Sequence, residues 1–436
     1  MTNISRNPGN RRDRATTEKW LLEYAVNSAK KSDKRRTYDG PDARAEDAAT
    51  IAQSVWRIIN SDDVLFSVIR KREGSPGSLN RVKLVPTTLG AAFLRCLLAD
   101  VEYIAMADPI DQANPFIGLF KQVIARNAEA DAAAGILHQP VRYELRYWTK
   151  IRRCLTDDEL WIYESGLNEA VEEIRERGRA RSFADTLKPY TRLAAKNYGS
   201  LLELIRALFR KHHRLLVIRV DFEYGKAHRS VSFSKVRKHG EALVRYLKRV
   251  QHRKRNVYKG YVLKLEYGLQ RGWHFHGLIF LDGDVVHGDV HYGKMFGEHW
   301  KTTTTKGMGA YYNCNANAQK YGKDCGIGIV ESDNVGRRYA LETHVAGYLT
   351  KPDFYAPMMK VEGKRLFFRS EVPKTPAVKR GRKRTMPDVV PVLDKMPLPF
   401  KARRRCGNLL PKIRKPDSNE TEWVAYRYPW ESLAQV

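Results

Sequence analysis

The feature that most constrains how this chain can fold is a predicted β-hairpin in the second half of the sequence. Residues 261–267 form a strand-like run, and residues 268–272 begin and end with glycine, as a tight turn does. Residues 273–281 are apolar at most positions, so we expect a central strand covered by helices on both faces. If the loop contains three residues, Tyr267 pairs with Trp273 and the register of the hairpin is set.

Two histidines and a glutamate of this hairpin are predicted to share one face. His274 and His276 are two positions apart on a strand, so both side chains point the same way. The predicted register places Glu266 opposite His274, so that three potential metal ligands converge. A loop longer or shorter by one residue would put Glu266 on the other face. For the hairpin alone, the alternative is a solvated glutamate and two hydrogen-bonded core histidines.

A second segment, residues 337–351, has helical spacing and is followed by proline. Tyr348 and Lys351 stand three positions apart and therefore share a helix face, together with His344 one turn earlier. Tyr339 would lie on the opposite side of a uniform α-helix, at about 100° per residue, so we expect a single reactive tyrosine. His344 either assists proton transfer or is a partly exposed helical residue without a chemical role.

These residue types together indicate transfer of a phosphoryl group to tyrosine. A tyrosine nucleophile conserves the phosphodiester energy in a covalent link and leaves a free 3′-hydroxyl. A phenol has a pKa of about 10 and is mostly protonated at neutral pH, so the attack needs a nearby cation or base, a role that Lys351 fits. A metal held by the two histidines and the glutamate would polarise the scissile phosphate.

The same residues carry a resemblance to a known family. Glu266, the block of residues 273–277 and the Tyr348/Lys351 pair occur in the order found in HUH-type single-strand DNA endonucleases that initiate rolling-circle replication. The chain more closely resembles the replication-initiation proteins of filamentous bacteriophages (inoviruses) and their YagK/YfjJ-type prophage relatives. In that group a segment like residues 198–205 and a strand like residues 215–222 precede the histidine block. The resemblance covers roughly residues 195–356.

The resemblance implies a function, a cofactor and partners. We expect a replication-initiation nickase that cuts single-stranded origin DNA through a 5′-phosphotyrosine intermediate and rejoins it, with Mg²⁺ or Mn²⁺ as cofactor. The DNA would be single-stranded or supercoiled, a host helicase and polymerase would be recruited, and the location would be the cytoplasm of a bacterial host. The alternatives are a transposase or relaxase with the same chemistry, or a basic DNA-binding regulator without catalytic activity.

The pattern around these segments predicts an α+β fold with a central antiparallel sheet of HUH or ferredoxin-like type and flanking helices, preceded by a mainly helical region. The predicted elements are strands at 215–222 and 326–331, helices at 234–253 and 296–302, and a mobile loop at 302–324. Asp221, at the end of the first strand, is either a fourth metal ligand or a structural cap, and we favour the cap. The predicted domains are a disordered segment 1–16, a helical accessory region 17–195, an endonuclease domain 196–360 and a basic, proline-rich tail 373–436.

A formal charge of +29 and a pI of about 9.9 indicate an anionic polymer as partner. The predicted DNA-binding residues of the tail are Arg380, Arg382, Lys383, Arg384, Arg403, Arg404 and Arg405. No apolar run of about 18 residues could span a membrane, and residues 1–14 contain no apolar signal-peptide core. Five scattered cysteines form no disulfide framework, which indicates a reducing cytoplasm.

Overall fold

The computed structural model describes residues 17–19, 21–22, 41–70, 82–98, 114–124, 155–268, 271–354 and 365–373. The predicted disordered segment 1–16 and nearly all of the predicted tail, including its seven DNA-binding residues, lie outside the described residues. Within the described ranges, no helix is long and apolar enough to cross a membrane.

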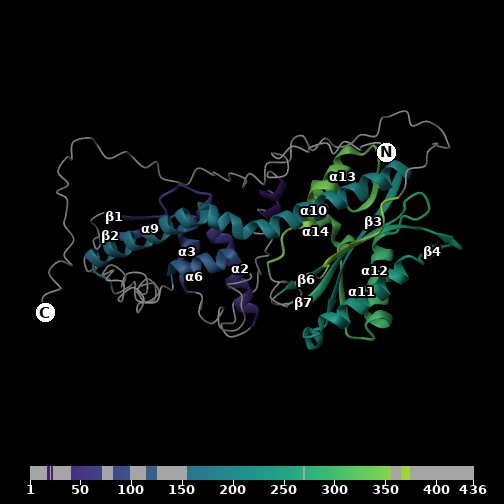
Figure 1. Cartoon of the computed structure of the whole chain (residues 1–436), viewed down its shortest axis with the longest axis horizontal. Coiled ribbons are helices and arrows are strands. Elements are labelled where there is room, and N and C mark those ends of the chain that lie inside the picture. Colours follow the sequence, from purple (N-terminus) through teal and green to yellow (C-terminus); the bar gives the residue numbers. More distant parts are fainter. Residues whose placement is uncertain are drawn as a thin grey trace, which may run out of the picture. The chain divides into compact units, whose positions relative to one another are not determined.

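A six-stranded sheet organises the second half of the chain, and all of its strand pairs are antiparallel (Figure 1). The strand order is β10 (Phe367–Arg369), β6 (Tyr258–Gly268), β7 (Gly272–Asp282), β3 (Arg214–Tyr224) and β8 (Gly309–Asn313), and β9 (Gly328–Glu331) also pairs with β3. The central strands β7 and β3 are buried along most of their length, as their apolar sequences predict. The prediction of an α+β fold with a central antiparallel sheet is therefore confirmed.

The hairpin formed by β6 and β7 has the predicted register. Glu266 pairs with His274, and the last pair, Gly268 with Gly272, leaves a loop of three residues. Gly272 has a φ of 65°, in the left-handed region that favours glycine. A Cβ atom at this position would also lie 2.5 Å from the carbonyl oxygen of Arg229. The turn that sets the register therefore requires glycine at position 272.

The side of the sheet that we call the core face is apolar from end to end. Its buried residues from the three central strands include Leu216, Ile218, Val220, Phe222, Leu263, Leu265, Trp273, Phe275, Ile279 and Leu281. Helices α11 (Phe233–Leu247) and α12 (Asp289–His299) pack on it, and α12 continues into a π-helical turn, Trp300–Thr304. Gly240 of α11 allows this close packing, because a Cβ atom there would lie 2.6 Å from the ring of Phe275.

The opposite side, the site face, changes character along its length. Toward one end it is apolar, with Leu215, Val217, Val262, Leu278 and Phe280 packed against helices. Toward the other end the same strands bury Arg219, Asp221, Lys264, Glu266, His274 and His276. Helix α10 (Arg181–Lys211) and the segment α13 (Val335–Ala340), π-helix Leu341–Val345 and α14 (Ala346–Thr350) cover this face.

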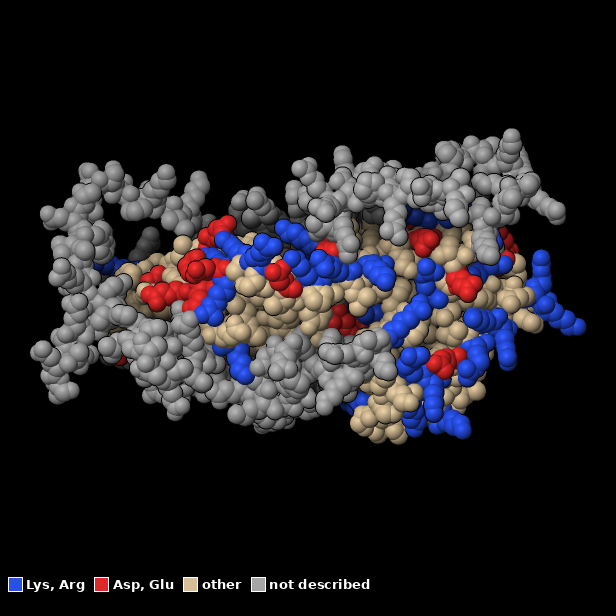
Figure 2. All heavy atoms as spheres, in the orientation of Figure 1, with Lys and Arg blue, Asp and Glu red and all other residues tan. Residues whose placement is uncertain are grey.

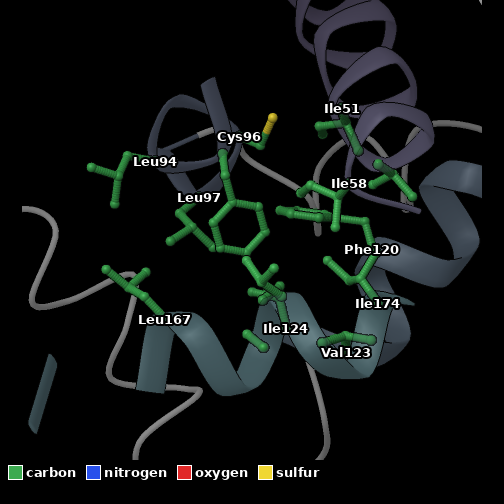
Figure 3. Packing of buried hydrophobic residues seen from close by; sticks show 14 of the residues in the cluster. Ile51, Ile58, Leu94, Cys96, Leu97, Phe120, Val123, Ile124, Leu167 and Ile174 are labelled. Atoms are coloured by element: carbon green, nitrogen blue, oxygen red, sulfur yellow. The ribbon is translucent and has the colours of Figure 1, made fainter. Parts of the chain in front are cut away.

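The described part of the N-terminal region is mainly helical and has its own apolar core. Helices α2 (Pro41–Ile59), α3 (Thr88–Leu98), α6 (Pro115–Ile124) and α9 (Asp157–Arg179) supply this core, where Ile58, Phe120 and Ile174 are fully or almost fully buried (Figure 3). A capping box between Thr156 and Glu159 starts α9. A small hairpin of β1 (Phe66–Arg70) and β2 (Val82–Pro86) was not predicted.

Two predicted elements in the second half, the loop at 302–324 and the helix at 234–253, differ from the structure. The segment 302–324 is not a mobile loop, because it contains β8, paired with β3, and a 3-10 helix, Asn315–Asp324. The predicted helix 234–253 ends at Leu247, after which a short hairpin of β4 (Gln251–His252) and β5 (Arg255–Asn256) precedes β6. The pairing of β8 with β3 joins segments far apart in the sequence, and the turn of the β4–β5 hairpin lacks the glycine or asparagine that usually marks such a turn.

Candidate metal and nucleophile site

Three side chains that could hold a metal ion meet at the polar end of the site face. One nitrogen each of His274 and His276 and one carboxylate oxygen of Glu266 lie within 4.8 Å of one another. All three residues are buried, with exposed fractions of 4%, 1% and 8%, respectively. Glu266 Oε2 is 3.3 Å from His276 Nε2 and 4.0 Å from His274 Nε2. The hairpin register thus brings the predicted ligands together.

The other ring nitrogen of each histidine is held by a hydrogen-bond acceptor. His274 Nδ1 lies 3.0 Å from the carbonyl oxygen of Gly272, and His276 Nδ1 lies 2.7 Å from Asp221 Oδ1. Because both partners accept hydrogen bonds, each Nδ1 carries the proton and donates it. Each Nε2 then faces Glu266 and is the nitrogen that would bind a metal ion. Outer hydrogen bonds of this kind fix the tautomer and orientation of metal-binding histidines.

The two imidazoles have opposite pKa shifts. Burial lowers the pKa of His276, but Asp221, Tyr348 and Glu266 outweigh burial and raise it to about 10. Burial and the neighbouring His276 lower the pKa of His274 to about 4. Without a metal, His276 therefore keeps a proton between two carboxylates. A divalent cation bound to Nε2 would take the place of that proton, because both compete for one lone pair.

The charge and the unpartnered oxygen of Glu266 also suit a bound metal ion. Burial raises the pKa of its carboxyl, but Lys351 and His276 outweigh burial and hold the pKa well below its usual value, so the group is ionised. Its second oxygen, Oε1, is buried and has no hydrogen-bond partner among the described residues. A buried anionic oxygen is costly without a cation or a donor. Two imidazoles and one carboxylate suit several divalent metals and leave coordination positions open for phosphate oxygens.

The predicted nucleophile and lysine lie beside this group. The rings of Tyr348 and His276 have centroids 5.1 Å apart. Lys351 Nζ is 4.6 Å from the centroid of the Tyr348 ring and 4.0 Å from Glu266 Oε2. The five residues predicted to carry the chemistry therefore form one cluster, although residues 266 and 348 come from segments far apart in the sequence.

Positive charge around Tyr348 favours its phenolate form. Burial raises the pKa of Tyr348, but His276, Lys351 and Arg219 outweigh burial and lower it below the usual value of about 10. The guanidinium carbon of Arg219 lies 4.3 Å from the centroid of the tyrosine ring. The phenol is thus surrounded by cations that would stabilise the deprotonated nucleophile.

The segment that carries Tyr348 is anchored to helix α10 through Glu342. This fully buried carboxylate accepts hydrogen bonds from Arg206 at 2.9 Å and from Arg338 at 2.8 Å. The hydroxyl of Tyr198 on α10 donates to the backbone carbonyl of Glu342 at 2.9 Å. A π-helix occupies Leu341–Val345, so the assumption of a uniform α-helix between the two tyrosines is wrong.

Three charged residues of the site were missed or misassigned from the sequence. Arg219, Asp221 and Lys264 are buried on the site face next to Glu266 and the two histidines. Asp221 is not a strand cap, because β3 continues to Tyr224; it accepts hydrogen bonds from His276 and from Arg219. The sequence shows charged residues two positions apart within apolar strands, so each pair shares a face, and the pairing of β3 and β6 with β7 puts that face on the histidine side.

A cavity of about 280 Å³ opens beside Tyr348. Its walls include Arg219, Tyr321, His344 and Tyr348. Tyr339 does not line this cavity, although its ring lies 6.3 Å from that of His344, which does. The structure therefore provides room next to Tyr348 for part of a substrate, with a buried cation and aromatic rings in the wall.

Comparison of the chain with protein-family models, with curated proteins and with solved structures gives no significant match.

Proposed function

We propose that this protein is a metal-dependent, site-specific DNA nickase that cuts single-stranded DNA through Tyr348 and later rejoins it. The observation that carries this proposal is the position of the Tyr348 ring, 5.1 Å from a histidine whose Nε2 faces a buried carboxylate. A tyrosine held among cations, beside a ligand set for a divalent metal, is suited to attack a phosphodiester. The order of the motifs along the chain supports the same chemistry.

The reaction can be written for the residues of this site. The Tyr348 oxygen forms a bond to phosphorus while the bond from phosphorus to the 3′ oxygen breaks. The 3′ oxygen leaves with its electron pair and takes up a proton, so the products are a 5′-phosphotyrosine and a free 3′-hydroxyl. The reverse reaction rejoins the strand, because the covalent link conserves the energy of the phosphodiester.

The surrounding residues have distinct roles in this proposal. Lys351 and Arg219 stabilise the phenolate before the attack and the negative charge on phosphorus during it. Glu266, His274 and His276 would hold Mg²⁺ or Mn²⁺, which would act as a Lewis acid on the scissile phosphate. Asp221 orients His276 through its Nδ1 proton and is a positioning residue.

We place this activity in rolling-circle replication. A free 3′-hydroxyl can prime synthesis by a polymerase, and a helicase would separate the strands ahead of it. The phage-type motifs favour a bacterial cytoplasm and an origin of single-stranded or supercoiled DNA. The strong positive charge of the chain suits this partner.

The test is formation of a covalent adduct. The full chain is incubated with Mn²⁺ and a pool of randomised single-stranded oligonucleotides labelled at the 3′ end, because the 3′ fragment stays on the tyrosine. Wild type and Tyr339→Phe should form a labelled adduct that resists denaturation, and Tyr348→Phe should not. Salt-sensitive binding without any adduct in the wild type would show a DNA-binding regulator instead.

A further inference from the structure

A strained hairpin between α11 and β6 carries an unusual turn. In β4–β5, Gln251 pairs with Asn256 and His252 with Arg255, so the loop is the dipeptide Arg253-Lys254. Both loop residues have positive φ angles, of 47° and 64°. Two consecutive positive φ angles characterise a type I′ turn, in which Asn-Gly is strongly preferred. Arginine and lysine are poor residues for this backbone, which indicates that their side chains serve a purpose at the tip.

The hairpin is also the centre of a strongly basic segment. Residues 242–265 contain eight lysines and arginines and no aspartate or glutamate. Arg253, Lys254 and Arg255 are exposed, and in the described part of the chain no carboxylate forms an ion pair with them. Figure 2 shows Lys and Arg side chains projecting from the surface where Figure 1 places β4. These charges are therefore available to an external anion.

The base of the hairpin is held firmly while its tip projects. Asn256 Nδ2 donates to the carbonyl of Lys248 at the end of α11 at 3.2 Å, and the backbone N–H of Val257 donates to Val250 at 3.1 Å. Tyr292 of α12 lies against His252, with its hydroxyl 3.4 Å from Nδ1. The strained turn is thus presented on an anchored base, so little ordering is needed when it binds a partner.

We propose that the β4–β5 hairpin binds the sugar-phosphate backbone of duplex DNA that flanks the strand cut at Tyr348. A two-stranded ribbon fits the major groove, which is about 12 Å wide, and basic side chains at its tip would contact phosphates. The position relative to the cut rests on the proposed function. β6 runs from the hairpin to the candidate metal ligands, and the eight residue-to-residue steps from Tyr258 to Glu266 span about 26 Å, or about eight base pairs.

The experiment uses a double substitution that removes the positive charges of the turn without destabilising the fold, because the new residues suit the turn better than the natural ones. Arg253→Asn with Lys254→Gly removes two charges and installs the preferred Asn-Gly, so the melting temperature should stay the same or rise. Arg192→Gln with Lys196→Gln, at exposed positions of α10, removes the same charge elsewhere and is the matched control. Binding is measured on single-stranded DNA joined to duplex arms of increasing length, across a range of salt concentrations.

We expect the Asn-Gly variant to lose affinity only for DNA that carries long duplex arms. Wild-type affinity for DNA should increase once the duplex arm reaches about eight base pairs from the cut, and the Asn-Gly variant should lack this increase. On long arms the variant should bind about tenfold more weakly, and the dependence of its log affinity on log salt concentration should have a slope lower by about two. Equal losses in the control variant, or equal losses on single-stranded DNA, would overturn the proposal. So would duplex affinity that is unchanged while binding to anionic phosphatidylglycerol vesicles falls. Absence of an adduct in the wild type would refute the nickase alone, because the dependence on arm length is measured by binding.

Discussion

The two faces of the central sheet are built from alternate residues of the same strands, yet they differ in almost every physical respect. On β7, Trp273 and Phe275 point into a fully apolar core, while His274 and His276 between them point into a cluster of charges. The comparison shows that one strand can stabilise the fold and carry the site at the same time. Period-two alternation keeps the two tasks on separate sides.

The difference also explains how a buried polar cluster is tolerated. Burying charged groups costs free energy unless they are paired, and even a paired cluster contributes little net stability. The core face compensates for this, with large aromatic side chains such as Phe222, Phe275 and Trp300 almost completely buried. We therefore expect substitutions on the site face to change chemistry more than stability, and substitutions on the core face to do the reverse.

The largest effect is expected for Tyr348→Phe. Loss of the phenolic oxygen removes the proposed nucleophile, so adduct formation should fall at least about a thousandfold. The ring contacts with His276 and Arg219 remain possible for phenylalanine, so metal affinity and melting temperature should stay close to those of the wild type. Adduct yield is measured with a 3′-labelled oligonucleotide and metal affinity by titration calorimetry. Adduct formation by Tyr348→Phe would disprove the assignment of the nucleophile.

The next largest effect is expected when both histidines are changed to alanine. His274→Ala with His276→Ala removes two of the three proposed ligands, and Mn²⁺ affinity should fall at least about a hundredfold. DNA binding should remain within a fewfold of wild type, because most affinity comes from phosphate contacts. Calorimetry with Mn²⁺ and fluorescence anisotropy with labelled DNA measure the two properties. Unchanged Mn²⁺ affinity would show that the metal is not bound at this face.

Much of the contrast between the faces could be predicted from the sequence. Given a loop of three residues, the glycine-bounded turn and the two-residue period place Glu266 opposite His274, and the structure confirms both the loop length and this pair. The helical spacing of Tyr348 and Lys351 correctly predicted that they share a face, since Lys351 Nζ lies 4.6 Å from the tyrosine ring. These features depend on residues close together in the sequence, where backbone geometry determines the outcome.

The rest depends on contacts between distant segments. β8 pairs with β3 across about ninety residues, as in the pair of Asp221 and Tyr312, and its glycine- and asparagine-rich surroundings resemble a loop. The role of Asp221 became visible only when β3 and β7 were aligned, because its partner His276 is 55 positions away. The π-helix before Tyr348 has no recognisable sequence signal either. Tertiary pairing determines these features.

An intermediate effect on the site face is expected for Asp221→Asn. The amide is nearly the same size as the carboxylate but removes the negative charge beside His276 Nδ1, which lies 2.7 Å away. The histidine becomes a weaker ligand, so Mn²⁺ affinity should fall about 10- to 100-fold, with saturating Mn²⁺ restoring most adduct formation. Calorimetry and adduct yield against Mn²⁺ concentration test this. An unchanged affinity would mean that Asp221 only balances the charge of Arg219.

The smallest effect on Mn²⁺ affinity is expected for a substitution on the core face, at Phe275 between the two histidines. Phe275→Leu shortens a buried ring that packs against Gly240 of α11, and the free energy of unfolding should fall by about 1–2 kcal/mol. Because this side chain points away from the ligands, Mn²⁺ affinity should change less than about twofold. Urea denaturation and calorimetry measure the two quantities on the same protein. A loss of Mn²⁺ affinity as large as that of Asp221→Asn would show that the two faces are coupled through the backbone of β7, and the separation of tasks along this strand would have to be abandoned.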